Sequence, residues 1–435
     1  MDRSLLGLAL AAPALVAQPA PFPAGEWTGT IQVPGPGLGI SVTLAGRGSA
    51  WTGRISIPAQ GVKDQPLDEV QVTADTVSFA MNGIPGIPRF AGRQVREGVI
   101  EGRFTQGGHT FPFSLTRGAA APRPVPQDPR DRDLAFPGFN AFPLKGSVRK
   151  GGAHPYFAVM VAGSGPTDRD WSNPLIPAPS HGGRDFAAWL EAQGIGSLRF
   201  DKRFIGSKDP KLDISLDAQV GDIRAAMKAA RALPEAKGKK LLLVGHSEGA
   251  LLALLAAGDA DAALLLAMPG MSYAKTILAQ VKGQLDAAGA PGDAAAQNLA
   301  YLESVLEAIR KGQDLPPAAA GVAPGVVALG KGLTRPESRG FVRDLLDLDP
   351  WGAAQRLPIP CAVAWGERDV QTWKPEVLPP DFKGTVIQIP EANHLFKRET
   401  RERAALSGRE AMTAYGDGTP LADLTPLAAW LKALR

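Results

Sequence analysis

The stretch LLLVGHSEGALLALLAAG, residues 241–258, constrains the fold of this chain more than any other. Residues 241–244 are a short apolar run typical of a buried parallel strand, and residues 250–257 form a strong helical pattern. The pattern G-x-S-x-G, centred on Ser247, lies between them. In a sharp turn from strand to helix this pattern strains the serine backbone, and glycines flank it because strand and helix pass too close for side chains. The stretch therefore predicts an exposed serine hydroxyl above a parallel sheet, and a tight turn with an ordinary serine is the alternative.

Strand and helix patterns alternate through the second part of the chain, from about residue 134 to 435. The strand-like runs include YFAVMVAGSG, GSLRFDKR, AALLLAMPG, IPCAVAWGERD and GTVIQIPEANHLFK. Repeated strand-then-helix order predicts a parallel sheet with helices on both faces. Between about 271 and 348 the alternation stops and an Ala/Leu-rich helical pattern takes over. We therefore expect an α/β domain over 134–435 with a helical cap inserted above its sheet.

The first part of the chain has a different pattern. Residues 25–117 read as short alternating strands with Gly and Pro turns between them, which predicts a small all-β sandwich or barrel. Residues 118–133, GAAAPRPVPQDPRDRD, are rich in proline and charge and predict a linker.

The N-terminal residues 1–20 have one basic residue, an apolar stretch over residues 5–16 and small residues near Ala17. This pattern predicts a signal peptide and therefore an exported, periplasmic or secreted protein. The alternatives are a later start site or an ordinary apolar N-terminus in a cytoplasmic protein.

Charge and cysteine content exclude several classes of function. A formal net charge of +4 over 435 residues, without a basic block, argues against a nucleic-acid partner. The apolar N-terminal stretch is too short to span a membrane, so stable membrane insertion is not expected. The single cysteine, Cys361, excludes an intrachain disulfide, and its apolar surroundings in sequence indicate a buried packing role.

A serine hydroxyl needs a base within hydrogen-bond reach and an acid to orient that base. His394 follows the last strand, at the carboxyl edge where open α/β sheets place their sites. Asp369 follows the preceding strand, and the order serine, acid, histidine is the one this type of turn uses. Glu367 is the alternative acid, with a solvated loop position as its other interpretation. His246 and His181 are not expected to act as the base.

The oxyanion of an acyl-transfer reaction needs two backbone N–H donors. We expect Glu248 to supply one through its backbone, with its carboxylate in solvent. The other should come from the loop after YFAVMVAGSG, from Ser164 or the adjacent Gly165.

Six separated motifs occur in this order: AGSGPTDRDW (162–171), LRFDKR (198–203), GHSEGA (245–250), AMPG (267–270), GERDVQ (366–371) and ANHLFK (392–397). In these motifs the chain resembles the α/β-hydrolase superfamily, and specifically the EstD-type carboxylesterases that carry an extra N-terminal β domain. The resemblance implies an α/β-hydrolase fold, with Ser247 as nucleophile, His394 as base, Asp369 as orienting acid and the Ser164 loop as half of the oxyanion hole. Phe204 departs from the family pattern, which has a glycine after DKR, so we expect a reshaped loop there.

The expected function is therefore a serine hydrolase that cleaves small-molecule esters with short to medium acyl chains through an acyl-enzyme. It needs no metal and no cofactor. An aminopeptidase or thioesterase on the same scaffold is the nearest alternative, for which Glu303 and Glu307 could recognise an amine, although a solvated helix surface also explains them. A non-catalytic binding protein is the alternative from another class.

Overall fold

The computed structural model describes residues 24–434 except 34–37, 49, 58–61, 85, 118–127, 174–179, 208, 210, 288, 407–410, 412–413 and 417. The predicted signal peptide, and residues 118–127 of the predicted linker, lie outside the described residues. The chain divides into two compact units, the strands β1 to β9 and the part from β10 to α10.

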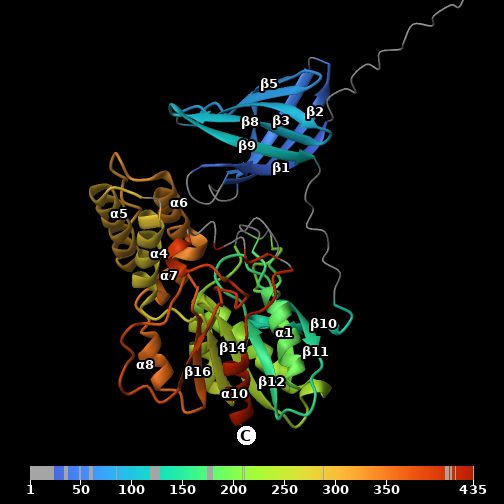
Figure 1. Cartoon of the computed structure of the whole chain (residues 1–435), viewed down its shortest axis with the longest axis vertical. Helices are drawn as coiled ribbons and strands as arrows, with labels where there is room; N and C mark the ends of the chain where they lie inside the picture. Colours follow the sequence, from blue (N-terminus) through green and yellow to red (C-terminus); the bar gives the residue numbers. More distant parts are fainter. Residues whose placement is uncertain are drawn as a thin grey trace, which may run out of the picture. The chain divides into compact units, whose positions relative to one another are not determined.

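The N-terminal unit is a single antiparallel sheet in the order β4-β3-β2-β1-β9-β8-β7-β6-β5 (Figure 1). Its strands are β1 (Gly25–Ile31), β2 (Leu38–Arg47), β3 (Ala50–Ile57), β4 (Val62–Pro66), β5 (Asp68–Val72), β6 (Thr76–Ala80), β7 (Arg89–Arg96), β8 (Val99–Gln106) and β9 (His109–Arg117). β3 also contacts β5, so the sheet curls toward a barrel and does not split into two layers. Alternate apolar residues such as Trp27, Phe90 and Phe113 fill its interior. The predicted all-β domain is confirmed, in its barrel-like form.

The second unit is built on an eight-stranded sheet in the order β10-β11-β13-β12-β14-β15-β16-β17. Its strands are β10 (Asp131–Pro137), β11 (Pro143–Arg149), β12 (Tyr156–Val161), β13 (Gly196–Phe200), β14 (Lys240–His246), β15 (Ala262–Leu266), β16 (Cys361–Gly366) and β17 (Thr385–Ile389). The six strands from β12 to β17 pair in parallel, whereas β10 and β11 pair antiparallel. The predicted α/β fold with a parallel sheet is confirmed.

Strands β10 and β11 were absent from the sequence prediction. β10 begins at Asp131, inside the range predicted as linker. Its first carboxylate lies between two buried guanidinium groups, 2.7 Å from Nε of Arg149 on β11 and 2.7 Å from Nη2 of Arg199 on β13. The charged residues that indicated a linker thus attach an edge strand to the sheet.

Each face of this sheet has its own core, because the central strands β12, β15 and β16 are apolar along their length. On β12, Phe157 and Val159 face the core that includes α2 (Leu216–Arg231) and α3 (Glu248–Ala256). Ala158 and Met160 face the opposite core, with α1 (Gly182–Ala192) and α10 (Thr425–Ala433). The short 3-10 turns of this unit include η2 (Phe139–Ala141), η3 (Pro234–Ala236), η4 (Ala257–Asp259) and η5 (Arg403–Ala405).

Helices replace strands between β15 and β16, as predicted for the cap. They are α4 (Tyr273–Ala287), α5 (Gly292–Arg310), α6 (Pro324–Leu333), α7 (Pro336–Leu345) and α8 (Pro350–Gln355). Figure 1 shows α4 to α7 gathered into one group, and α5 contacts α4, α6 and α7. The buried side of α5, with Leu302, Val305 and Ile309, joins the core of the α2–α3 face.

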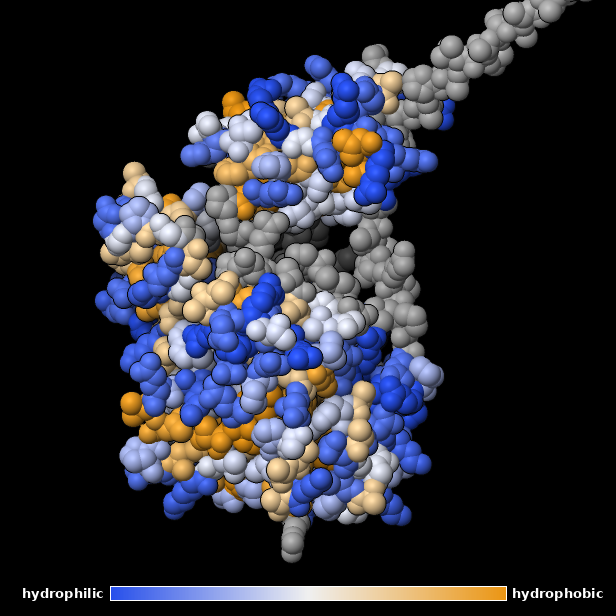
Figure 2. Space-filling view, in the orientation of Figure 1, coloured by the Kyte–Doolittle hydropathy of each residue, from blue (hydrophilic) through white to orange (hydrophobic). Residues whose placement is uncertain are grey.

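Polar side chains cover much of the face of the second unit seen in Figure 2, with one apolar area near α8. Within the described parts of the chain, every helix is too short or too polar to cross a membrane.

Candidate active site

Ser247 lies in the turn between β14 and α3. Its backbone has φ 56° and ψ −124°, a strained conformation for a residue with a side chain. A Cβ atom on Gly245 would lie 2.5 Å from the carbonyl oxygen of Gly249, and one on Gly249 would lie 2.5 Å from that of Ala162. The glycines of G-x-S-x-G are therefore required by close backbone approach, as the sequence predicted.

Asp369 and His394, which the sequence predicted as acid and base, are hydrogen-bonded to each other. Nδ1 of His394 donates to Oδ2 of Asp369 at 2.8 Å, and both side chains are buried. The Asp369 carboxylate also accepts from the N–H groups of Gln371 (2.7 Å) and Thr372 (3.0 Å) and from the Thr372 hydroxyl (3.0 Å). Burial raises the pKa of Asp369, but the charge and hydrogen bond of His394, together with these N–H donors, bring the pKa below its usual value. The arrangement keeps Asp369 ionised and leaves Nε2 of His394 to carry the lone pair.

The residue before Ser247 contacts His394. His246, the residue before Ser247, donates from Nε2 to the backbone carbonyl of His394 at 2.8 Å, and its ring centroid lies 4.8 Å from that of His394. Among the hydrogen bonds of the described residues, none joins Ser247 to His394, so the assignment of the nucleophile stays a prediction.

His246 itself is buried and stacks on Trp171, with ring centroids 4.5 Å apart. Burial, with a smaller contribution from the charge of His394, lowers its pKa to about 3. His246 is therefore neutral near pH 7 and holds the His394 loop.

The loop that was predicted to supply an oxyanion donor follows β12 and passes beside Ser247. A Cβ atom on Gly163 would lie 3.2 Å from Cβ of Ser247. The next residue, Ser164, is exposed, and its carbonyl accepts from the Thr167 hydroxyl at 2.6 Å. Gly165 has a φ of 65°. Glu248 is the first residue of α3, where helical geometry leaves the N–H without a partner inside the helix. Both donor assignments stay predictions.

The Glu248 carboxylate was expected in solvent, and this expectation was wrong. The side chain is buried and accepts a hydrogen bond at 2.7 Å from the hydroxyl of Tyr273, the first residue of cap helix α4. Burial raises the pKa of Tyr273 well above its usual value, and the Glu248 charge adds to this effect. Glu248 thus links the serine turn to the cap.

Lys202, from the motif DKR, is a further buried residue of the site that sequence reasoning missed. Its ammonium group donates to the carbonyl oxygen of Gly163, directly before Ser164. Burial lowers the pKa of Lys202 to about 8, although the negative charge of Glu248 opposes this shift. The position of DKR directly after a strand was the signal that could have identified it.

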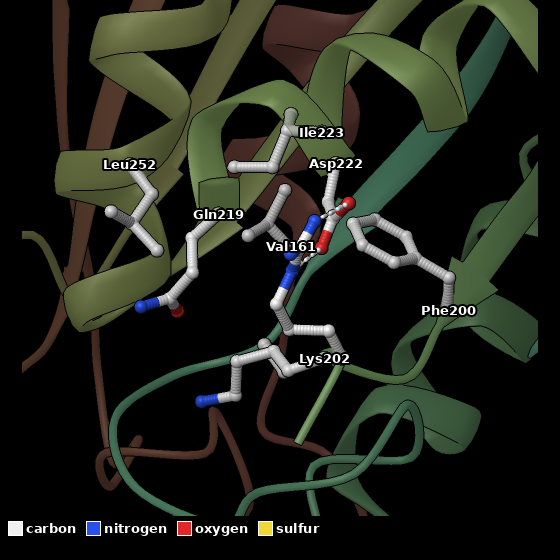
Figure 3. Close-up of a pocket in the computed structure, with 9 residues that line it drawn as sticks. Val161, Phe200, Lys202, Gln219, Asp222, Ile223 and Leu252 are labelled. Carbon is white, nitrogen blue, oxygen red and sulfur yellow. Dashed lines mark hydrogen bonds and ion pairs between the residues drawn. The ribbon is translucent and has the colours of Figure 1, made fainter. Parts of the chain in front are cut away.

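A small cavity lies behind this lysine. It is lined by Val161, Ala162, Phe200, Lys202, Arg203, Gln219, Asp222, Ile223 and Leu252, and its volume of about 10 Å³ is the space of one water molecule. Figure 3 shows the Lys202 amine pointing away from Asp222, which Arg203 binds at 2.7 Å. This cavity is too small for an ester substrate, and the residues that line it pack behind the site.

The DKR loop turns tightly after these residues. The N–H of Ile205 donates to the carbonyl of Lys202 at 2.8 Å, and Gly206 has a φ of 74°. The ring of Phe204 lies 5.2 Å from the Lys202 nitrogen. Phe204 therefore covers the buried ammonium group at the position where a glycine was expected.

Other residues of the second unit lie in supporting positions. Arg169 binds Asp201 through two nitrogens, which braces the loop after Ser164. His181 is buried and occupies the N-cap position of α1. Glu367 has a half-exposed side chain, 3.8 Å from Arg368. Cys361 is buried, and burial raises the pKa of its thiol to about 12, in accord with a packing role.

Solved structures with similar chain paths include an esterase of Pyrococcus furiosus and a dienelactone hydrolase of Anabaena variabilis. The first has 16% identity, covers 64% of this chain and 86% of its own, and gives a TM-score of 0.38. The second has 13% identity, covers 70% and 98%, and gives a TM-score of 0.35.

Sequence comparison gives closer matches. The protein named Esterase EstD of Thermotoga maritima is 27% identical over 310 residues, which cover 69% of this chain and 67% of that protein. The sequence profile described as the alpha/beta hydrolase family matches residues 158–427, more than half of the chain and all of the segment that holds Ser247, Asp369 and His394. The chain therefore belongs to the alpha/beta hydrolase family.

Proposed function

We propose that this protein is a serine hydrolase of carboxylic esters. The observation that carries the proposal is the buried hydrogen bond between His394 and Asp369, held next to a strained serine turn by the contact of His246 with the His394 backbone. The similarity to a protein named an esterase supports the choice of ester as substrate.

In the proposed first step Oγ of Ser247 attacks the ester carbonyl carbon while Nε2 of His394 accepts the hydroxyl proton. The oxyanion receives hydrogen bonds from the N–H of Glu248 and from an N–H of the loop that holds Ser164. The C–O bond to the alcohol then breaks, and His394 gives its proton to the departing oxygen. A water molecule attacks the acyl-enzyme by the same route, which releases the acid and restores Ser247.

Asp369 has two roles in this sequence. Its carboxylate holds the His394 proton on Nδ1, so Nε2 is the nitrogen that faces the reaction. It also stabilises the imidazolium formed in each half-reaction. No metal and no cofactor takes part in these steps.

We infer a preference for short to medium acyl chains from the composition of the cap. Its helices are rich in alanine and leucine, and the apolar side of α5 packs against the sheet core. Each methylene that enters an apolar acyl pocket adds about 0.8 kcal/mol until the pocket is full. We expect kcat/KM to rise from acetyl esters and then to level off or fall before long-chain esters.

Glu303 and Glu307, the candidate amine site of the aminopeptidase alternative, are both exposed on α5. Glu307 is exposed on α5 and pairs with Arg310 and Lys311 at 3.3 Å and 3.2 Å, which fits a solvated helix surface. Turnover of 4-nitrophenyl esters from acetate to palmitate, beside aminoacyl anilides and acyl thioesters, separates the three substrate classes. Labelling by a fluorophosphonate probe that is lost in Ser247→Ala would support the serine mechanism, and esters left intact by unlabelled, folded protein would refute it.

A further inference from the structure

Four arginines lie in the two segments that carry the candidate acid and base, and three of them pair with glutamates. Arg368 binds Glu402 at 2.6 Å, Arg398 binds Glu391 at 3.1 Å and Arg401 binds Glu399 at 2.6 Å. The fourth, Arg403, has no carboxylate or carbonyl partner among the residues that the structure describes. Its guanidinium lies over the Trp373 ring, 4.5 Å from the centroid.

Arg403 is partly buried, so its guanidinium has lost part of its hydration. Burial lowers the pKa of Arg403, and the nearby charge of Asp369 opposes this shift. The nitrogen atoms of Arg403 are not fully buried, so a ligand can reach them.

Trp373, the ring on which Arg403 stacks, lies between the candidate acid and the start of the cap in its contacts. Trp373 directly follows Thr372, whose N–H and hydroxyl both bind Asp369. The carbonyl oxygen of Trp373 lies 3.5 Å from the position of a Cβ on Gly270, just before the cap. Stacking on an aromatic face fixes the plane of a guanidinium and leaves its N–H edge free for a bidentate acceptor.

We propose that Arg403, oriented by Trp373, binds a carboxylate of the substrate, so that the enzyme prefers esters that carry a free carboxylate to neutral esters of the same length. This inference rests on the proposed ester hydrolysis and specifies its substrate class. The substrate carboxylate accepts hydrogen bonds from the N–H groups of Arg403. Glu402, Glu391 and Glu399 play this part for the other three arginines.

The test compares matched pairs of esters in the full-length protein. Monoethyl succinate with ethyl butyrate, and monoethyl adipate with ethyl hexanoate, place the carboxylate on the acyl side. 4-Acetoxybenzoate with phenyl acetate places it on the alcohol side. In wild type we expect kcat/KM for the anionic member of at least one pair to exceed that for the neutral member, and the preference to shrink as salt is raised.

Two substitutions and a control identify the residue responsible. Arg403→Gln should lower the ratio of anionic to neutral kcat/KM by about 10- to 100-fold, the range of a charged hydrogen bond. Arg403→Lys, which keeps the charge but not the planar fork, should recover part of the ratio. Arg398→Gln, which breaks an exposed pair with Glu391, should leave the ratio at the wild-type value. Circular dichroism checks that each variant is folded.

A binding measurement separates this inference from the proposed function. In a Ser247→Ala background, calorimetric titration with monoethyl adipate should give a Kd that rises by about 10-fold or more when Arg403→Gln is added. Loss of this binding supports the carboxylate site even if ester turnover is absent. Equal binding with and without Arg403→Gln, or a ratio of kcat/KM that Arg403→Gln does not change, would overturn it.

Discussion

The imidazole of His246 donates a hydrogen bond from Nε2 to the backbone carbonyl of His394 at 2.8 Å. The residue next to the candidate nucleophile therefore fixes the backbone of the candidate base. The two residues belong to segments separated by more than a hundred positions in the chain. This contact therefore fixes the position of the serine turn relative to the loop after β17. It requires a proton on Nε2 of His246, and burial keeps the ring neutral near pH 7.

The first prediction concerns the three candidate catalytic residues. Ser247→Ala should remove nearly all ester turnover, and His394→Ala should cost about as much, because residues that act as a unit have losses that do not add. Asp369→Asn should be somewhat milder, since Asp369 orients His394 and forms no bond to substrate. Initial rates on 4-nitrophenyl butyrate test all three, with Glu367→Gln as the control for the alternative acid. Full turnover by folded Ser247→Ala would contradict the assignment.

The second prediction concerns acid stability. In the folded protein the pKa of His246 is lowered by burial from 6.5 to about 3, so the unfolded chain binds a proton in this interval and the folded chain does not. The contribution to stability is complete above pH 6.5 and is lost as the pH falls toward 3, by up to about 1.4 kcal/mol per pH unit. His246→Gln should show a shallower loss of unfolding free energy in urea between pH 6.5 and 4. His109→Gln, on the exposed end of β9, is the control, and identical slopes for wild type and His246→Gln would rule out this origin.

Much of the second unit could be predicted because central strands such as β12, β15 and β16 are apolar along their length and the serine turn has a characteristic spacing. Strands β10 and β11 could not, because residues such as Asp131, Lys145 and Arg149 interrupt their apolar pattern, and their place in the sheet depends on Arg199, far along the chain. The side chains of Asp131 and Arg149 are nevertheless buried, because they pair with each other and Asp131 also pairs with Arg199.

The candidate site shows the same division. Ser247, Asp369 and His394 could be selected from strand ends and chain order. The burial of Glu248 and Lys202 could not, because a charged residue in isolation is best interpreted as solvated. Their partners are a tyrosine of the cap and a backbone carbonyl of the loop after β12, which only the folded chain brings together.

The third prediction concerns Lys202. Lys202→Met removes the donor to the Gly163 carbonyl, so the loop beside Ser247 loses an anchor, and kcat on a 4-nitrophenyl ester should fall by roughly 10-fold with little change in KM. Removal of a direct oxyanion donor would cost more, about 10²- to 10³-fold. Because the pKa of Lys202 is about 8, the positive charge is present below this pH and is lost above it, so wild type should show a decline in kcat near pH 8 that Lys202→Met lacks. Lys282→Met, on an exposed pair of α4, is the matched control. A persistent decline near pH 8 in Lys202→Met would assign that titration to another group.

The last prediction concerns the point at which the second unit begins. A truncated protein that starts at Arg132 lacks Asp131 and leaves the buried guanidinium groups of Arg149 and Arg199 without that carboxylate, whereas one that starts at Asp128 keeps it. Removing one partner of a buried ion pair costs about 3–5 kcal/mol, so the shorter protein should unfold at markedly lower urea concentration. In the full-length chain Asp131→Asn should reproduce this loss, while Asp133→Asn, whose side chain is 76% exposed, should not. If both truncated proteins unfold at the same urea concentration, and Asp131→Asn matches wild type, then β10 is held by its backbone pairing with β11 and not by the ion pairs of Asp131.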